Sequence, residues 1–169
     1  MTAKLFKRCS RTVALLLLGG ISSIPALTIK APKNWEKLPN PPAGIILQYQ
    51  STVAHEGFYP NLNILRTKPD SVLLSLKSPM EFAARMQSTQ ERLFPMFKVL
   101  QKEERQIGLA RGALLVFKHA HGPHDYVAFE FSCIYKGEQV SLVYTCLASQ
   151  FDALRSEFEQ SLASLRWDP

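Results

Sequence analysis

Two apolar stretches near the C-terminal end of the chain constrain its fold more than any other part of the sequence. Residues 126–135 and 140–147 are rich in β-branched and aromatic residues, and residues 136–138 between them suit a tight turn, so the pattern predicts an antiparallel hairpin. A helical pattern capped by Ser149 follows, with apolar residues at spacings of three and four: Phe151, Leu154, Phe158, Leu162 and Leu165. A hairpin followed by a one-sided helix predicts an α+β domain in which the helix packs on the sheet.

The hairpin also predicts the state of the two cysteines in this half of the chain. With a two-residue turn at residues 137–138, Cys133 faces Leu142, and Cys146 faces Phe129 four residues farther along the ladder. That offset is about 13 Å at the rise of a strand, whereas a disulfide needs Cα atoms within about 7 Å. We therefore expect two buried free thiols. The same sheet face carries three aromatic side chains that we expect in the core: Phe129, Phe131 and Tyr144.

A second helix begins at Ser78, which is followed by Pro79 at the first helical position and by Glu81, the partner in a capping box. Pro95 disfavours helix at the residue before it, so the helix should end or kink there. Its apolar face is expected to contain Phe82, Met86 and Leu93. Further strands are expected at residues 44–50, 58–65, 97–105 and 112–118. The short apolar run at residues 71–76 fits either type of structure.

The first 26 residues have the pattern of a secretory signal. Four basic residues precede the uncharged apolar run at residues 13–21, which is too short for a typical transmembrane helix. Cleavage fits after Ala26 or after Ser22, and retention as an N-terminal anchor is the third alternative. A lipoprotein is disfavoured because Cys9 precedes the apolar run. Residues 27–34 then form a spacer, and residues 35–169 form a single domain.

The signal accounts for most of the positive charge. The chain has 20 Lys and Arg against 14 Asp and Glu, a net charge of +6. Four basic residues and no acidic ones lie in residues 1–26, which leaves 16 against 14, or +2, for the rest. Nucleic acid is therefore not an expected partner, because it requires a concentrated basic face. We expect a periplasmic or secreted protein, with membrane contact only through an uncleaved N-terminal segment.

Several short motifs resemble those of the PsbP-like and DcrB-like proteins. They are the Pro-Asn-hydrophobic strand at residues 58–64, the helix opening at residues 78–82, Ile107-Gly108 before a strand, and the terminal hairpin with its following helix. The resemblance implies an α/β/α sandwich with a central, mainly antiparallel sheet and flanking helices. It also implies a non-catalytic role, because members of this fold mostly bind another macromolecule or support an assembly. Many bacterial members are lipoproteins, and this chain departs from them by lacking the acceptor cysteine.

Three histidines form the sharpest candidate site. His119, His121 and His124 lie on or beside a Gly-Pro turn, where a continuing strand and the turn would bring the imidazoles together. Such a trio suits Zn²⁺, Cu²⁺ or Ni²⁺, although the spacing matches no named metal motif. The alternative is an ordinary polar loop with solvated histidines.

Catalytic signatures are absent from the sequence, including nucleophile elbows, zinc-protease motifs and phosphate-binding glycine loops. His55 and Glu56 are adjacent, but an acid–base pair needs a nucleophile or substrate group nearby. We therefore expect no enzymatic activity and no cofactor. The expected function is that of an exported domain that binds an unidentified protein partner in the envelope or supports an envelope assembly. The alternatives are a zinc- or copper-binding protein using the histidine loop and, with less support, an extracytoplasmic hydrolase.

Overall fold

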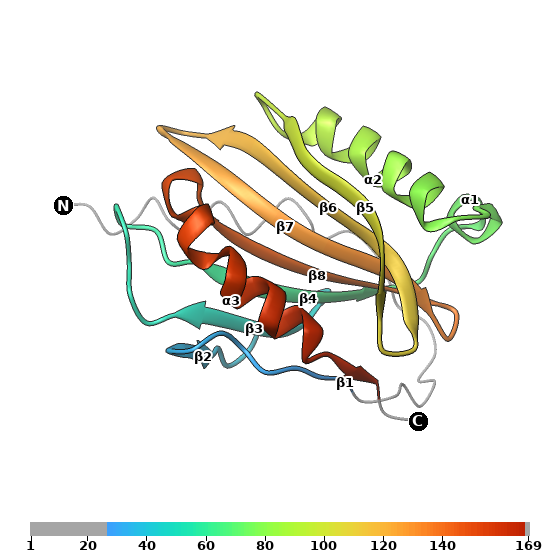
Figure 1. The fold of residues 1–169 in the computed structure, drawn as a ribbon, viewed down its shortest axis with the longest axis horizontal. Coiled ribbons are helices and arrows are strands. Elements are labelled where there is room, and N and C mark those ends of the chain that lie inside the picture. Colours follow the sequence, from blue (N-terminus) through green and yellow to red (C-terminus); the bar gives the residue numbers. More distant parts are fainter. Residues whose placement is uncertain (1–26, 168–169) are drawn as a thin grey trace.

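A seven-stranded sheet lies at the centre of the computed structural model, which describes residues 27–167 (Figure 1). Its strand order is β2-β3-β4-β8-β7-β6-β5, and every neighbouring pair is antiparallel. The strands are β2 (Trp35–Lys37), β3 (Ile45–Ser51), β4 (Asn61–Thr67), β5 (Lys98–Ile107), β6 (Ala110–His121), β7 (His124–Tyr135) and β8 (Glu138–Leu147). A separate two-stranded ladder joins β1 (Leu27–Thr28) to β9 (Arg166–Trp167). The predicted leader, residues 1–26, lies outside the described residues.

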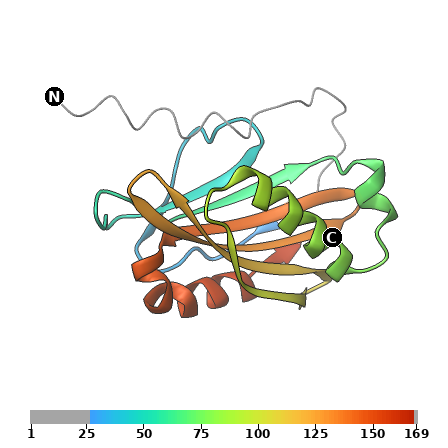
Figure 2. The ribbon, with the colours of Figure 1, turned by 90° about the horizontal axis from the view of Figure 1, so that it is seen from above.

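The helices flank the sheet on both faces. They are α1 (Ser71–Ser75), α2 (Pro79–Leu93), the single 3-10 turn η2 (Ala148–Gln150) and α3 (Phe151–Ala163). Helix α2 and α3 lie on opposite faces of the sheet, as Figures 1 and 2 show together. This arrangement confirms the expected α+β class and the α/β/α sandwich. None of the helices within residues 27–167 is long and apolar enough to cross a membrane.

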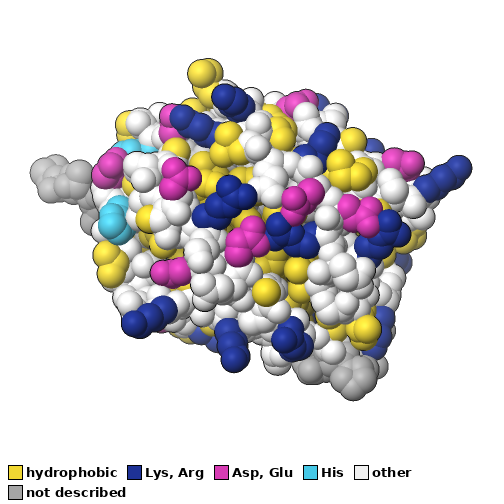
Figure 3. All heavy atoms as spheres, viewed as in Figure 1, with side chains coloured by type: hydrophobic (Ala, Val, Ile, Leu, Met, Phe, Trp, Pro, Cys, Tyr) yellow, Lys and Arg dark blue, Asp and Glu magenta, His cyan; other side chains and the backbone are white. Residues whose placement is uncertain are grey.

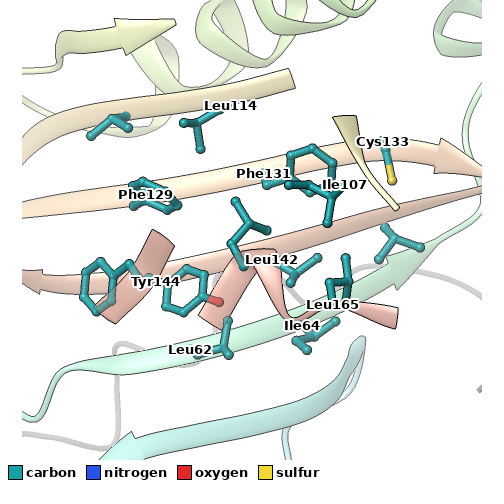
Figure 4. Close-up of a cluster of buried hydrophobic side chains, with 14 of the residues drawn as sticks. Leu62, Ile64, Ile107, Leu114, Phe129, Phe131, Cys133, Leu142, Tyr144 and Leu165 are labelled. Atoms are coloured by element: carbon teal, nitrogen blue, oxygen red, sulfur yellow. The ribbon is translucent and has the colours of Figure 1, made fainter. Parts of the chain in front are cut away.

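The larger hydrophobic core lies between the sheet and α3 (Figure 4). Phe129, Phe131 and Tyr144 are fully buried there, as the alternation of the hairpin predicts. Phe158 of α3 stacks on Tyr144, with ring centroids 4.9 Å apart. The smaller core, beneath α2, contains Phe82, Ala83 and Met86 from the helix against Leu115 and Phe117 from β6 and their neighbours.

A chain of hydrogen bonds that starts in the larger core and runs out to the surface ties the first described residues to that core. The Tyr144 hydroxyl donates to Ser161 Oγ at 2.9 Å, and the Ser161 hydroxyl donates to the carbonyl oxygen of Lys30 at 2.6 Å. The amide of Lys30 donates in turn to Ser164 Oγ at 2.8 Å. Helix α3 therefore fixes the main chain of Lys30, so part of the expected spacer contacts the domain.

Replacing Ser161 with alanine removes the centre of this chain. The buried Tyr144 hydroxyl and the Lys30 carbonyl then each lose a partner, and we expect a loss of about 2 kcal/mol in the free energy of unfolding. Urea denaturation followed by tryptophan fluorescence measures it, with Ser156→Ala on the exposed side of α3 as the control. A loss in Ser161→Ala no larger than in the control would contradict the importance of this chain.

The predicted register of the terminal hairpin is wrong by two residues. The turn consists of Lys136 and Gly137, whose φ angles are 48° and 81°, and Tyr135 faces Glu138. Two residues with positive φ match the twist of a hairpin, and glycine at the second position makes this turn favourable. Cys133 consequently faces Val140, six residues before Cys146 on β8. A shift of two residues keeps every side chain on its predicted face, so both cysteines are buried and free, as expected.

Five local predictions need correction or completion. Ser149 does not cap α3, because it lies inside η2 and α3 begins only at Phe151. Leu93, expected on the apolar face of α2, is exposed, whereas Ala83 in the first half of the helix is buried. Ser78 does cap α2, but Glu81 accepts from the amide of Lys77 rather than from that of Ser78. Residues 71–76, which the sequence left open, contain α1, and the strand expected at residues 58–65 begins at Asn61.

Candidate interaction surface

Three large apolar side chains lie exposed at the corner where α1 meets the start of α2. Val72, Leu74 and Met80 have exposed fractions of 47%, 58% and 39%. We call these three residues the α1 corner. Leu73 and Leu76 of the same segment pack against the smaller core, and this packing turns Val72 and Leu74 outward. Single exposed apolar side chains are common, whereas a group of them on one corner is a candidate contact site.

Polar contacts hold the α1 corner in place. Asp70 caps α1 by accepting from the amide of Leu73 at 2.7 Å, and its other carboxylate oxygen lies 3.2 Å from the Arg85 guanidinium of α2. The hydrogen bond from Leu73 and the charge of Arg85 lower the pKa of Asp70. The carboxylate therefore stays ionised and links α1 to α2 at neutral pH, so the apolar side chains project from a supported turn.

A depression of about 200 Å³ lies directly beside this corner. Its apolar lining includes Leu73, Leu76 and Ile134, while Lys77 and Arg111 add positive charge to it. On the face that carries α3, charged side chains of both signs are interspersed among the apolar ones (Figure 3). An apolar surface beside a shallow basic depression suits the side chains of a protein partner better than a small substrate, which needs a deeper enclosure.

The predicted metal ligands lie on one face of the hairpin between β6 and β7. His121 faces His124 across the turn, and His119 faces Tyr126 two pairs farther along the ladder. His119 is buried, with its ring 4.3 Å from that of Phe94 and 5.6 Å from that of Tyr126. Burial lowers the pKa of His119, so its ring is neutral at pH 7. It therefore forms part of an aromatic stack.

His124 and His55 each have a partner that is not one of the predicted metal ligands. His124 Nδ1 lies 3.4 Å from Glu56 Oε2, whereas His55 pairs with Phe58 through the backbone. The structure thus brings Glu56 to His124. Within residues 27–167, no three His, Cys, Asp or Glu side chains are placed so that they could hold a metal ion. Zinc or copper binding by His119, His121 and His124 stays a prediction.

Glu130 is a buried polar residue that the sequence motifs did not single out. It is 6% exposed in the centre of β7, on the face covered by α2. Gln90 Nε2 donates to one carboxylate oxygen at 3.2 Å, and Ser132 Oγ donates to the other at 3.1 Å. Burial raises the pKa of Glu130 to about 7. Glu130 is the single charged residue between positions 126 and 135, a signal that the sequence does contain.

Comparison with known proteins gives a fold. No protein-family model and no curated protein matches the chain. Among solved structures, LpqN of Mycobacterium tuberculosis, which is involved in cell envelope biogenesis, is 13% identical with a TM-score of 0.68. The match covers 86% of this chain and 84% of LpqN. Cyanobacterial PsbP (CyanoP) of Synechocystis sp. PCC 6803 is 14% identical with a TM-score of 0.60, over 90% of this chain and 98% of CyanoP.

The chain has the PsbP-like fold. PA94 of Pseudomonas aeruginosa, a protein of unknown function described as a putative regulator, has the same architecture. It is 14% identical with a TM-score of 0.63, and the match covers 85% of this chain and 98% of PA94. The resemblance inferred from short motifs is thus confirmed at the level of the fold. Identities this low carry no functional residue from one protein to another.

Proposed function

We propose that this PsbP-like domain is an exported, non-catalytic protein that binds a protein partner in the cell envelope through the α1 corner. The exposure of Val72, Leu74 and Met80 carries the proposal, because a domain that acts alone gains nothing from presenting three apolar side chains on a supported turn. The N-terminal signal pattern supports export to the periplasm or beyond. LpqN, with the same fold, is involved in cell envelope biogenesis, which agrees with a role in supporting an envelope assembly.

The dimensions of the α1 corner fit a small, transient protein–protein interface. Three apolar side chains and a neighbouring depression of about 200 Å³ offer a limited area. Interfaces at the low end of the size range are typical of transient encounters. Lys77 beside the depression favours a partner surface with acidic residues around an apolar centre, whereas Arg111 is already paired with Glu104.

Site-specific photocrosslinking in the native organism tests this function. A photoreactive amino acid at position 74 is expected to capture a discrete envelope protein, and the Val72→Asp substitution should reduce the yield about tenfold by placing a charge in an apolar contact. The matched control carries the same photoreactive residue at position 74 together with Val53→Asp. Val53 is 53% exposed in the loop between β3 and β4, so its substitution is chemically identical and equally exposed.

Two outcomes would count against the proposal. The first is the absence of a discrete crosslinked product from position 74 in cells that carry a normal amount of the domain. The second is an equal reduction by Val72→Asp and Val53→Asp, because the α1 corner would then have no special part in the contact.

A further inference from the structure

The two halves of α2 are attached to the sheet in different ways. All the buried residues of α2 belong to its first half: Phe82, Ala83 and Met86. After Met86 no residue of the helix is buried. Residues 87–93 are joined to the sheet by the part-buried hydrogen bond from Gln90 to Glu130 and by an exposed one from Lys102 of β5 to Gln87. Phe94, just beyond the helix, rests on Phe117 and His119. The second half of α2 is therefore attached through one buried carboxyl group, one exposed hydrogen bond from Lys102 and one terminal ring.

No described cation compensates a negative charge on Glu130. Its described partners are Gln90 from α2 and Ser132 from its own strand, both neutral. The other titratable groups on this face of the sheet have partners other than Glu130. Lys102 of β5 donates to Gln87, Glu104 of β5 bonds to Arg111, and His119 and Tyr126 stack on one another near the end of the hairpin. Arg85 of α2 pairs with Asp70, and the remaining charged residues of the helix, Glu81, Glu91 and Arg92, are exposed.

The local hydrogen bonds accommodate the neutral form of Glu130. Ser132 Oγ and Ser141 Oγ are 2.6 Å apart, and either hydroxyl can donate to the other. When Glu130 is protonated, its hydroxyl can donate to Ser132, which then donates to Ser141 of β8. When Glu130 is ionised, the same bonds reverse, but the negative charge remains in a site that excludes water. An isolated buried charge is costly, and local opening that admits water relieves the cost.

We propose that Glu130 makes the attachment of the second half of α2 dependent on pH, so that residues 87–93 are held on the sheet when the carboxyl group is protonated and released when it is ionised. Release uncovers the sheet face beneath the helix, including Leu115 and Phe117 of the smaller core. The first half of α2 keeps its buried anchors, so the motion is an opening of one helix end. Extracytoplasmic compartments experience a varying external pH, and such a domain would respond to it directly.

Amide hydrogen exchange measured by NMR tests the proposal. At pH 8.5 the amides of residues 87–93 should exchange about tenfold faster in the wild type than in Glu130→Gln, which keeps the shape of the side chain and removes its charge. At pH 5.5 the two proteins should agree within about twofold. Comparing both proteins at the same pH removes the effect of pH on the intrinsic exchange rate of the amides. Glu36→Gln on the exposed strand β2 is the control, and it should behave as the wild type at both values.

Three results would overturn the proposal. One is equal exchange of residues 87–93 in the wild type and Glu130→Gln at pH 8.5. Another is a rate ratio between the two proteins that is the same at pH 5.5 and 8.5. The third is exchange of residues 87–93 at the rate of α3, which would mean that the helix opens only when the whole domain unfolds.

A measurement on the wild type alone serves if Glu130→Gln fails to fold. The side-chain carboxyl carbon of Glu130 and the amides of residues 87–93 should change chemical shift with one common midpoint as the pH is raised. Amide shifts in this segment that stay constant while Glu130 titrates would also overturn the proposal.

Discussion

The Glu130→Gln variant is expected to be more stable than the wild type at pH 8, by about 3 kcal/mol, and by about 1 kcal/mol or less at pH 5. Glu130 has a pKa of about 7 in the folded protein and an ordinary value of 4.5 when exposed to water. Between these two values the folded protein keeps a proton that the unfolded chain releases. The stability that this proton supplies is therefore complete below pH 4.5 and is lost as the pH rises through 7.

Denaturation with guanidinium chloride at a series of pH values measures this difference in the free energy of unfolding. The other acidic groups titrate equally in both proteins, so the difference between wild type and variant isolates Glu130. A gap that is constant from pH 5 to pH 8 would mean that the effect of the substitution comes from packing and not from charge. A less stable variant at pH 8 would show that the carboxylate has a favourable partner.

Gly112→Ala is expected to destabilise the domain by about 3 kcal/mol, a large effect for a single added methyl group. Gly112 lies in β6 opposite Cys133 of β7. A Cβ at this position would lie 2.4 Å from the carbonyl oxygen of Ser132 and 2.8 Å from a ring carbon of Phe131. The first atom belongs to the backbone of the adjacent strand, so relief requires a movement of the β6–β7 ladder itself.

Gly108→Ala provides the comparison for this prediction. Gly108 has a φ of 56°, and an added Cβ there would meet only a ring carbon of Trp167 at 3.7 Å, an ordinary contact. Its cost should be about 1 kcal/mol, from the left-handed backbone conformation alone. Thermal and chemical denaturation of the two variants measures both losses of stability. The difference separates the steric collision at Gly112 from the backbone preference at Gly108. Equal losses would mean that β6 and β7 move apart at little cost.

The sequence predicts the elements that depend on local periodicity. Alternation places Phe129, Phe131 and Tyr144 on the core face, and this result survives the error in register because a shift of two residues preserves the face. The choice of turn decides the register, and the sequence alone does not separate a turn at residues 136–137 from one at residues 137–138. Ser149 has the chemistry of a cap, but the chain enters α3 through a 3-10 turn that places it inside the helical segment.

The candidate sites were harder to predict, because they depend on contacts between distant segments. Val72 and Leu74 are ordinary apolar residues in sequence, and their exposure follows only from Leu73 and Leu76 packing on the sheet. Glu130 is surrounded by apolar neighbours in sequence, but its partner Gln90 lies 40 residues away on α2. The histidines show the reverse. They are close in sequence, but the ring of His119 packs in an aromatic stack with Phe94 and Tyr126.

The pairing of Leu27 with Trp167 makes the two ends of the described domain neighbours in a ladder. A short linker could therefore join the two ends, and a circularly permuted chain could begin at the Gly122-Pro123 turn without interrupting a strand. The same geometry means that the whole domain fits into a surface loop of another protein as one insertion. A host protein would then receive the α1 corner and α2 as a unit whose attachment needs only two adjacent points.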